Sequence, residues 1–477
     1  MVPAMSGGHS KLTIPPRLRE EMTPAVFAFV ESLLRVIESQ QQELAKLRTR
    51  LNMTPQNSSL PPSSQHPHAK PSPPKAKSKR KQGGQPGHPK AERALLPPED
   101  VDETVVLKPS SCRRCGNQLR GNDPQPLRHQ VWELPEIKPT ITEYQRHRLT
   151  CPGCGESTCA LLPPGVPRGQ SGPRLTAFVA LLMAHFRQSK RRVSLFCETV
   201  LQTPCSTGLA VKLQNQATAA LEGCYSELTA ALPHASAANL DETGTKQKNQ
   251  KGWIWVAVTT TFTLFAIRLT RSAAVVRELL GESFTGTIIT DRYGAYNAYP
   301  RRQVCWAHLL RDFQALVDAG GGGKRIGRRL QQIARQLFHH WHRARDGTMT
   351  RRTMRRNIHE LKYPLWEVLE AGQRCRHAPT VAVCCDLFDR FDQLWMFLDH
   401  PDVEPTNNAA ERALRHAVIW RKLSFGTQSA SGSRFVETLL SVIETCRQQN
   451  RDVFAFVTDA VESHVAHRQT PSLLPGV

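Results

Sequence analysis

Three carboxylates lie in local sequences that indicate a role in a reactive site rather than on the solvated surface. Asp241 opens Asp-Glu-Thr-Gly, Asp291 ends the apolar run 286–291, and Glu411 lies in an Asn-Asn-Ala-Ala-Glu-Arg segment. Two adjacent carboxylates repel each other, and one is protonated near neutral pH unless a cation lies between them. A third acid completes a cation site, and Mg²⁺ needs few carboxylates because it keeps several waters. We therefore predict that the three acids bind two magnesium ions about 4 Å apart, which suits reaction at a phosphodiester.

The elements predicted around Asp241 and Asp291 bring these two acids together. Residues 238–241 are expected to end a first strand, and residues 286–291 form a buried fourth strand that ends at its carboxylate. The segments between them predict two further strands and a helix, at residues 253–260, 262–269 and 272–280. Three strands, a helix and another strand is the order of the ribonuclease H fold. In that fold the first and fourth strands are neighbours, so the two acids are expected side by side.

Glu411 is predicted as the third acid because its segment has the residue types of a helix start. At helical spacing Asn408, Glu411, Arg412 and Arg415 share one face, which places a carboxylate and two guanidiniums together. That combination suits a metal ion beside a phosphate.

Each acid also has a plainer interpretation. Asp241 fits an acidic turn, Asp291 a strand-end carboxylate, and Glu411 a capping residue bonded to Asn408 or an exposed partner of Arg415. The order of the three acids, with two at strand ends and one at a helix start, favours the cation site.

Two segments between the second and third acids bear on the site. His308 lies in Cys305-Trp-Ala-His, which is predicted to begin a helix after the fifth strand. Its ring is expected either to contact a phosphate or to pack within the fold. Residues 320–400 predict an Arg-rich helical insertion that holds DNA or shapes a dimer.

Two Cys-x-x-Cys pairs, each followed by Gly, predict a structural zinc site. Cys112 with Cys115 and Cys151 with Cys154 offer four thiolates, which suits tetrahedral zinc. Residues 131–134 and 141–149 have strand-like composition and are expected to form a hairpin between the pairs. Redox-active pairs are the alternative, which the two matched motifs flanking one small unit disfavour.

Composition points to a polyanionic partner. The 477 residues carry a formal net charge of +22, with 63 Lys and Arg against 41 Asp and Glu, and nucleic acid is the commonest partner of such a protein. No apolar run approaches the roughly 18 residues of a membrane span, and the N-terminus lacks a signal-peptide pattern. We expect a cytoplasmic, nucleoid-associated protein with reduced cysteines.

The N-terminal third predicts three further elements. Residues 27–51 carry a short heptad pattern, which indicates either a coiled coil that associates with a second copy or an amphipathic helix packed on its own domain. Its seam consists of Phe27, Val30, Leu34, Ile37, Leu44 and Leu51, with Gln41 and Arg48 at two polar positions. Residues 54–98 have the composition of a flexible linker, in which a basic cluster grips DNA phosphates or merely tethers. Residues 172–220 resemble a helix-turn-helix, with Ser206 as the expected cap of the second helix.

The chain resembles TnpC-type transposases of the insertion-sequence family numbered sixty-six. The resemblance rests on Asn57-Ser-Ser-Leu-Pro-Pro-Ser-Ser64, Gly83-Gly-Gln-Pro-Gly-His88, the paired Cys motifs, Asp241-Glu-Thr-Gly244, Asp291-Arg-Tyr-Gly-Ala-Tyr-Asn297, Cys305-Trp-Ala-His308, Asn407-Asn-Ala-Ala-Glu-Arg412, Arg421-Lys-Leu-Ser-Phe-Gly426 and Ser433-Arg-Phe-Val-Glu437. It implies a bacterial Asp-Asp-Glu transposase, with a ribonuclease H-like core interrupted by a helical insertion, that acts on the terminal inverted repeats of its own element and inserts it into target DNA. By position Asp241, Asp291 and Glu411 match the family's three acids, and accessory proteins encoded by the same element are implied. Leu60 and Thr245 depart from residues frequent in the family, but neither is at a catalytic position.

Together these observations predict a multidomain α/β protein. The expected segments are a leucine-zipper-like helix at 20–53, a linker at 54–98, a zinc-binding domain at 99–165, a helix-turn-helix-like segment at 172–220, a catalytic core at 235–425 with its insertion at 320–400, and a helical C-terminus at 426–477. The expected DNA contacts are Lys75, Lys77, Lys79, Arg80, Lys81, Arg191, Arg192, His308, Arg412, Arg415 and Lys422. Two other functions fit the same features: a DNA-binding regulator or domesticated remnant that does not cut, and a junction-resolving nuclease that cleaves without joining.

Overall fold

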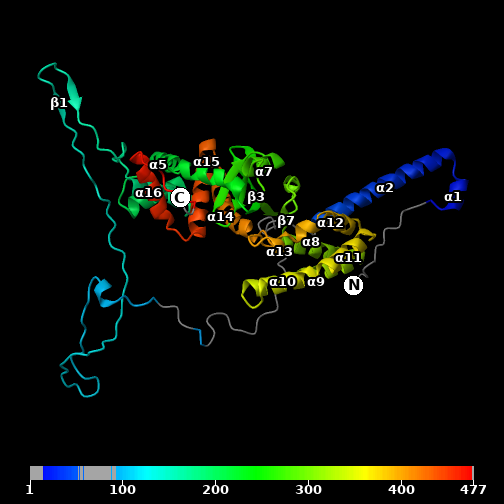
Figure 1. Cartoon of the computed structure of the whole chain (residues 1–477), viewed down its shortest axis with the longest axis horizontal. Helices are drawn as coiled ribbons and strands as arrows, with labels where there is room; N and C mark the ends of the chain where they lie inside the picture. Colours follow the sequence, from blue (N-terminus) through cyan, green and yellow to red (C-terminus); the bar gives the residue numbers. More distant parts are fainter. Residues whose placement is uncertain (1–13, 52, 54–56, 58–86, 89–92, 475–477) are drawn as a thin grey trace. The chain divides into compact units, whose positions relative to one another are not determined.

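The structure, a computed structural model, describes residues 14–474 except 52, 54–56, 58–86 and 89–92 (Figure 1). The basic cluster predicted between Lys75 and Lys81 therefore lies outside the described residues. Internal contacts divide the chain into two units, of which the larger comprises Met1–Pro67, Glu143–Leu195 and Cys205–Val477. The smaller comprises His68–Thr142 and Phe196–Pro204.

The N-terminal segment forms two helices, α1 (Pro16–Glu21) and α2 (Pro24–Leu51). The helix predicted from the heptad pattern is confirmed as a continuous element of 28 residues. Apolar side chains of that pattern are exposed along it, with Ile37 39% and Leu44 53% exposed. A second helix that covers them remains a prediction.

The region of the two Cys pairs contains little regular structure. Its elements are η2 (Pro98–Asp100), a short hairpin of β1 (Arg148–Thr150) with β2 (Ser157–Cys159), and an isolated bridge between Ser111 and Gln118. The hairpin predicted between the Cys pairs is wrong, because residues 131–134 form no strand and residues 141–149 become extended only from Arg148. Val131 is 79% exposed and Ile141 86%, so these apolar residues have no covered face to stabilise a ladder.

A five-stranded mixed sheet in the order β5-β4-β3-β6-β7 forms the centre of the larger unit. The strands are β3 (Ala237–Gln247), β4 (Gln250–Val258), β5 (Thr263–Arg268), β6 (Thr287–Thr290) and β7 (Arg302–Val304). Strands β3, β4 and β5 pair antiparallel as consecutive hairpins, whereas β6 pairs parallel with β3, and β7 pairs parallel with β6. Helix α7 (Ala273–Leu280) provides the crossover that a parallel connection requires.

The predicted strands and crossover helix are confirmed in order and kind, with one correction. The first strand does not end at Asp241 but continues to Gln247. Pairing with β6 stops at Asn239, while pairing with β4 continues until Gln247 opposes Gln250. The antiparallel hairpin therefore carries β3 six residues beyond the acid.

Helix α15 (Ala430–Gln448) covers the outer edge of β5 through polar side chains. The backbone N–H groups of Thr263, Phe265 and Ile267 donate to Thr445 Oγ1, Ser441 Oγ and Glu437 Oε2, at 3.1, 2.8 and 2.7 Å. The three acceptors recur every four residues, which matches one face of a helix, while the donors recur every two along the strand. The exposed side of an edge strand is thereby hydrogen-bonded within the chain.

Further helices pack against one another and α15. Helix α3 (Pro173–Ala184) is almost entirely buried and contacts α5 (Thr207–Ala220) and α16 (Val453–Val465). Ser206 caps α5 as predicted, since its Oγ accepts from the N–H of Leu209 at 3.1 Å. The other two helices of this region are α4 (Lys190–Thr199) and α6 (Glu222–Ala231), followed by η3 (Leu232–His234).

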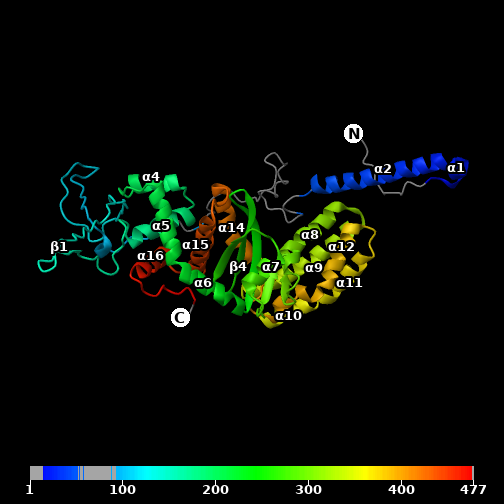
Figure 2. The same cartoon turned by 90° about the horizontal axis from the view of Figure 1, so that it is seen from above.

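The segment predicted as a helical insertion is helical and shares a core with the sheet; that it interrupts a catalytic core remains a prediction. After α8 (Trp306–Ala319) come α9 (Gly321–Arg345), α10 (Arg351–His359), α11 (Lys362–Gln373), α12 (Ala378–Asp389), η5 (Phe391–Leu394) and α13 (Met396–Asp399) (Figure 2). Buried Ile289 and Val304 of the sheet belong to the same apolar cluster as the insertion's side chains. At Gly327 a Cβ atom would lie 2.8 Å from the carbonyl oxygen of Phe313, so α8 and α9 approach closely only because glycine stands there.

The insertion also covers the other edge of the sheet, at β7. Gln303 Nε2 donates to the carbonyl oxygen of Leu394 at 3.2 Å, and its Oε1 accepts from the N–H of Phe397 at 3.0 Å.

Among the described residues, no helix is both long and apolar enough to cross a membrane.

Candidate active site

The register of the central strands places Asp241 beside Asp291. Asn239 of β3 is paired with Ile289 of β6 in a parallel ladder. Two residues beyond this last pair are Asp241, still on β3, and Asp291, the residue directly after β6. The two predicted acids therefore lie at the same end of two adjacent strands, β3 and β6.

Asp241 is half-buried and lies within range of other carboxylates. Burial raises its pKa well above the usual value for an aspartate, and the charges of Glu242, Asp291 and Glu411 act in the same direction. Its Oδ1 accepts the N–H of Glu242 at 2.8 Å, a contact that opposes the rise only in part. All three predicted acids thus contribute to one electrostatic environment.

Asp291 is positioned by the loop that follows β6. Its Oδ1 accepts the N–H of Tyr293 at 2.9 Å. The fully buried Arg302 side chain on β7 donates to the backbone carbonyl of Asp291 and, at 2.8 Å, to Thr290 Oγ1. Burial lowers the pKa of Arg302 to about 10, with the charge of Asp291 opposing the change. This guanidinium fixes the backbone that carries the second acid.

Glu411 lies in the first turn of α14 (Asn408–Ser424), as predicted, and a buried asparagine attaches that turn to the sheet. Asn407 is fully buried, and its Nδ2 donates to the carbonyl oxygen of Leu240 at 2.7 Å. Its Oδ1 accepts from Asn239 Nδ2 at 3.0 Å, and its N–H donates to Cys305 Sγ at 3.1 Å. The start of α14 is therefore bonded to β3 beside Asp241 and to the start of α8.

Residues of α8 contact the carboxylate of Glu411. Arg311 Nη2 donates to Glu411 Oε1 at 3.2 Å, and His308 Nε2 lies 3.5 Å from the same oxygen. Neither plainer interpretation of Glu411, a cap bonded to Asn408 or a partner of Arg415, describes these contacts. His308 is 13% exposed, burial and the nearby Arg311 lower its pKa, and its Nδ1 has no hydrogen-bond partner within the described part of the chain. Its contact with a phosphate remains a prediction.

A fourth carboxylate, Glu242, lies next to Asp241 but is engaged elsewhere. Its side chain is 2% exposed, accepts from Arg271 Nε at 2.7 Å, and also accepts from the hydroxyl of Tyr296. Burial raises the pKa of Glu242, while the Tyr296 and Arg271 contacts oppose the rise. Arg271 in turn stacks on the ring of Tyr293, which links this network to the Asp291 loop.

Sequence reasoning did not identify the roles of Arg311, Asn407 and Glu242. A signal was present for Asn407, because an Asn doublet precedes the helix and only one Asn is needed at a cap. None of the described His, Cys, Asp and Glu side chains forms a group of three or more arranged to hold a metal ion. The acids are neighbours, but Glu411 is turned to Arg311.

The two Cys pairs form similar turns. The N–H of Gly116 donates to the carbonyl of Cys112, and that of Gly155 to the carbonyl of Cys151, each at 2.9 Å. Both glycines have positive φ, 76° and 73°, a backbone conformation that favours glycine. Backbone amides lower the pKa of Cys112 and of Cys151, which favours thiolates.

Apart from the largely buried His308, the described DNA-contact candidates lie on helix surfaces. Arg191 and Arg192 are exposed in the first turn of α4. Arg412, Arg415 and Lys422 are exposed on α14, and their spacing of three and seven residues places them on one face.

Comparison with known proteins identifies the family of this chain. The family described as "Transposase IS66 family" matches residues 168–434, more than half of the chain, and a "Family of unknown function (DUF6444)" matches residues 14–94. "Uncharacterized protein y4hP" of Sinorhizobium fredii is 24% identical over 416 residues, which cover 78% of this chain and 74% of that protein. "Uncharacterized protein y4qI" of the same organism is 26% identical over 194 residues, or 37% of this chain and 35% of that protein. The chain belongs to the IS66 family of transposases.

Proposed function

We propose that this protein is a DNA transposase that binds the terminal inverted repeats of a bacterial insertion sequence and catalyses metal-dependent phosphodiester cleavage and strand transfer. The observation that carries the proposal is the convergence of three acids from distant parts of the chain. Asp241 and Asp291 each lie two residues beyond Asn239 and Ile289, the last pair in the parallel ladder of β3 and β6. Asn407 holds the turn that bears Glu411 against β3.

The residues at this place fit a divalent cation. Burial raises the pKa of Asp241, and the charges of neighbouring carboxylates raise it further, so a bound cation would stabilise the ionised group. Asp241, Asp291 and Glu411 would hold magnesium, with Glu411 exchanging its contact with Arg311 for the ion. When bound, a magnesium pair activates a water or a DNA 3′ hydroxyl and stabilises the leaving oxygen.

The chain's own residues supply positioning and charge. Arg302 fixes the backbone of Asp291, while Asn407 fixes the start of α14. Once Glu411 turns to the ion, Arg311 is free to face a phosphate oxygen, for which a guanidinium is well suited. Arg412, Arg415 and Lys422 would extend the positive surface along α14 and contact the DNA backbone.

The finer architecture belongs to the same proposal. The strand order supports a ribonuclease H-like core with a helical insertion. Structural zinc bound by Cys112, Cys115, Cys151 and Cys154 is proposed from the two sequence motifs, and the local turns at Cys112 and at Cys151 each favour a thiolate. Helices α4 and α5 would contact DNA in a helix-turn-helix-like manner, and α2 would pair with a second copy as a coiled coil. DNA in the bacterial cytoplasm is the partner, together with accessory proteins of the same element.

A non-catalytic DNA-binding regulator, or domesticated remnant, is the second candidate. The observation in its favour is that Glu411 is already bonded to Arg311 and lies beside His308. A remnant would keep the fold and the DNA contacts while Glu411 served only to hold α8 and α14 together. The two candidates differ in chemistry rather than in binding.

Cleavage and strand transfer on duplexes carrying the terminal repeats, with Mg²⁺, test the proposal. We expect the unaltered protein to nick the end and join it to target DNA, and Asp291→Ala to lower both rates by about a hundredfold to a thousandfold or more. End binding should persist in that variant, because phosphate contacts on helix surfaces do not involve Asp291.

Glu282→Gln is the matched control, since it removes an exposed carboxylate outside the site. Equal loss of cleavage in this control would assign the effect to the surface rather than to the acids. Specific binding without chemistry, even with the element's accessory proteins added, would favour the regulator.

A further inference from the structure

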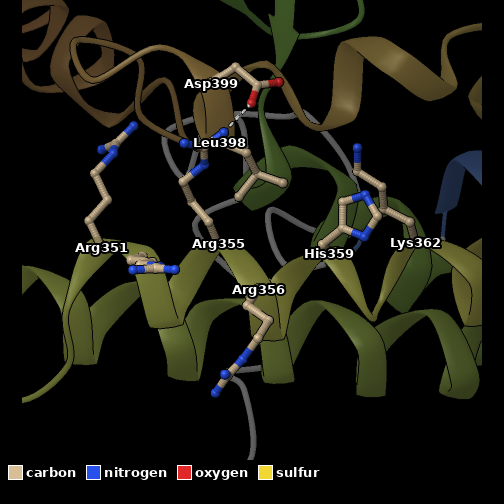
Figure 3. A pocket seen from close by; sticks show the side chains of 8 residues that line it. Arg351, Arg355, Arg356, His359, Lys362, Leu398 and Asp399 are labelled. Carbon is tan, nitrogen blue, oxygen red and sulfur yellow. Dashed lines mark hydrogen bonds and ion pairs between the residues drawn. The ribbon is translucent and has the colours of Figure 1, made fainter.

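A pocket of about 440 Å³ on the helical insertion is lined mainly by basic side chains. Its walls come from helix α10, the first residue of α11 and the end of α13 (Figure 3). The lining residues are Arg351, Arg352, Arg355, Arg356, His359, Lys362, Leu398 and Asp399. We call this set the α10 pocket. None of its members belongs to the candidate active site.

Helical spacing arranges the basic side chains of α10 in two rows. Arg351, Arg355 and His359 recur every four residues and share one face of α10, which Figure 3 shows rising toward Asp399. Arg352 and Arg356 form a second row one residue further round. All five side chains are exposed. An extended ligand can therefore contact several cations at successive turns.

The charge of the α10 pocket is only partly compensated. Arg355 pairs with Asp399 at 2.8 Å, and Arg351 donates to the backbone carbonyl of Phe397 at 3.1 Å. Within the described residues, Arg352 and Arg356 have no ion pair. Residues 321–362 contain twelve Lys and Arg but only two acids, Asp346 and Glu360, so this segment supplies a net ten of the chain's +22. Exposed like charges at this density are stabilised by a polyanion.

We propose that the α10 pocket binds the phosphate backbone of duplex DNA. Arg forks match phosphate oxygens, and two parallel rows on a helix suit a continuous line of phosphates better than a single small anion. The lining includes neither Asn nor Gln, the amides that pair with adenine, so the contact is expected to position DNA without discriminating sequence. The inference rests on the proposed function only in taking DNA as the partner.

The test measures duplex affinity of the full chain against salt concentration, in EDTA so that no cleavage occurs. The double variant Arg352→Gln/Arg356→Gln should lower affinity for terminal-repeat and unrelated duplexes by the same factor. It should also reduce the slope of log affinity against log salt by about 2, roughly one for each phosphate that the variant can no longer neutralise.

Two further variants control for charge and folding. Arg374→Gln/Arg376→Gln removes the same charge from exposed positions outside the α10 pocket and should leave the slope nearly unchanged. Arg352→Lys/Arg356→Lys keeps the charge and should retain most of the slope. Thermal unfolding should show that all three variants remain folded.

A slope unchanged in the Gln variant, or reduced equally in the Lys variant or the Arg374/Arg376 control, overturns the proposal. ATP serves as a second probe, for a free nucleotide. If the Gln variant loses ATP binding while its duplex affinity is intact, the pocket takes a nucleotide and the proposal is overturned. Cleavage by the unaltered protein and by the Asp291→Ala variant is measured in a separate experiment. The DNA-binding inference therefore stands or fails independently of the catalytic proposal.

Discussion

Asp241 illustrates how an active-site residue opposes the stability of its own fold. Its carboxylate is half-buried among Glu242, Asp291 and Glu411, and burial and their charges raise its pKa. A carboxyl whose pKa is raised by folding favours the native state while it is protonated. That contribution is fully present below the unfolded pKa of about 4 and is lost as pH rises through the folded pKa. Stability at neutral pH is therefore lowered unless a cation is bound.

The substitution Asp241→Asn should raise thermal stability at pH 7 in EDTA, because it removes the buried charge but keeps the shape. The gain should shrink as pH falls and vanish near pH 3, where Asp241 is protonated in both states. Mg²⁺ should stabilise the unaltered protein but not the variant. Scanning calorimetry from pH 3 to 8 checks all three; a variant less stable than its parent at every pH would contradict the argument.

The role of a residue could be predicted where neighbouring residues in the sequence indicate it. It could not be predicted where the role depends on contacts with distant parts of the chain. The strand and helix settings of Asp241, Asp291 and Glu411 were predicted because apolar periodicity and cap composition are local signals. Arg311 contacts Glu411 across 100 residues, and Asn407 contacts Leu240 across 167. A single sequence does not show which distant residues contact each other. The roles of Arg311 and Asn407 therefore became clear only from the fold.

At the scale of elements, the two Cys turns show which features need tertiary support. Gly116 and Gly155 adopt positive φ, which depends on the single residue and needs no distant partner. The predicted strand at residues 131–134 does not form, since alternating apolar residues need both a partner strand and a covered face. The first strand was predicted too short because its length also depends on a partner strand. Pairing with β4 continues β3 beyond Asp241 to Gln247.

Maleimide labelling with mass spectrometry tests the zinc proposal. In zinc-loaded protein, Cys112, Cys115, Cys151 and Cys154 should react slowly, and a chelator should make all four react quickly because they are otherwise exposed or half-exposed. Buried Cys305, whose pKa is raised by burial to about 11, should stay unlabelled until the protein unfolds.

Half-exposed Cys375 should label equally with and without zinc, which makes it the internal control. Equal reactivity of the four motif cysteines in both conditions would remove zinc from the proposal.

At the scale of the whole molecule, the N-terminal helix offers the clearest surface for self-association. Helix α2 carries apolar side chains at heptad spacing that remain exposed in one chain. Covering each such side chain is worth about 1.5–3 kcal/mol, so a few of them suffice for a stable pair of helices.

The double variant Leu34→Glu/Ile37→Glu should therefore weaken self-association by at least about tenfold. Leu33→Glu/Val36→Glu, which alters exposed apolar residues of the same helix outside the heptad seam, should have less effect. Sedimentation velocity over a concentration series measures both. If the two variants dissociate alike, or neither does, α2 does not pair through the predicted seam.

The sealed edges of the sheet have a consequence for synthesis. Helix α15 completes the hydrogen bonds of β5, yet it is made more than 160 residues after that strand. At 5–20 residues per second, the N–H groups of β5 therefore wait about ten to thirty seconds on the ribosome for their partners. An open strand edge is a template for pairing with another chain. Neighbouring ribosomes on one message hold identical open edges during that interval, so a truncated chain lacking α15 is expected to aggregate where the complete chain does not.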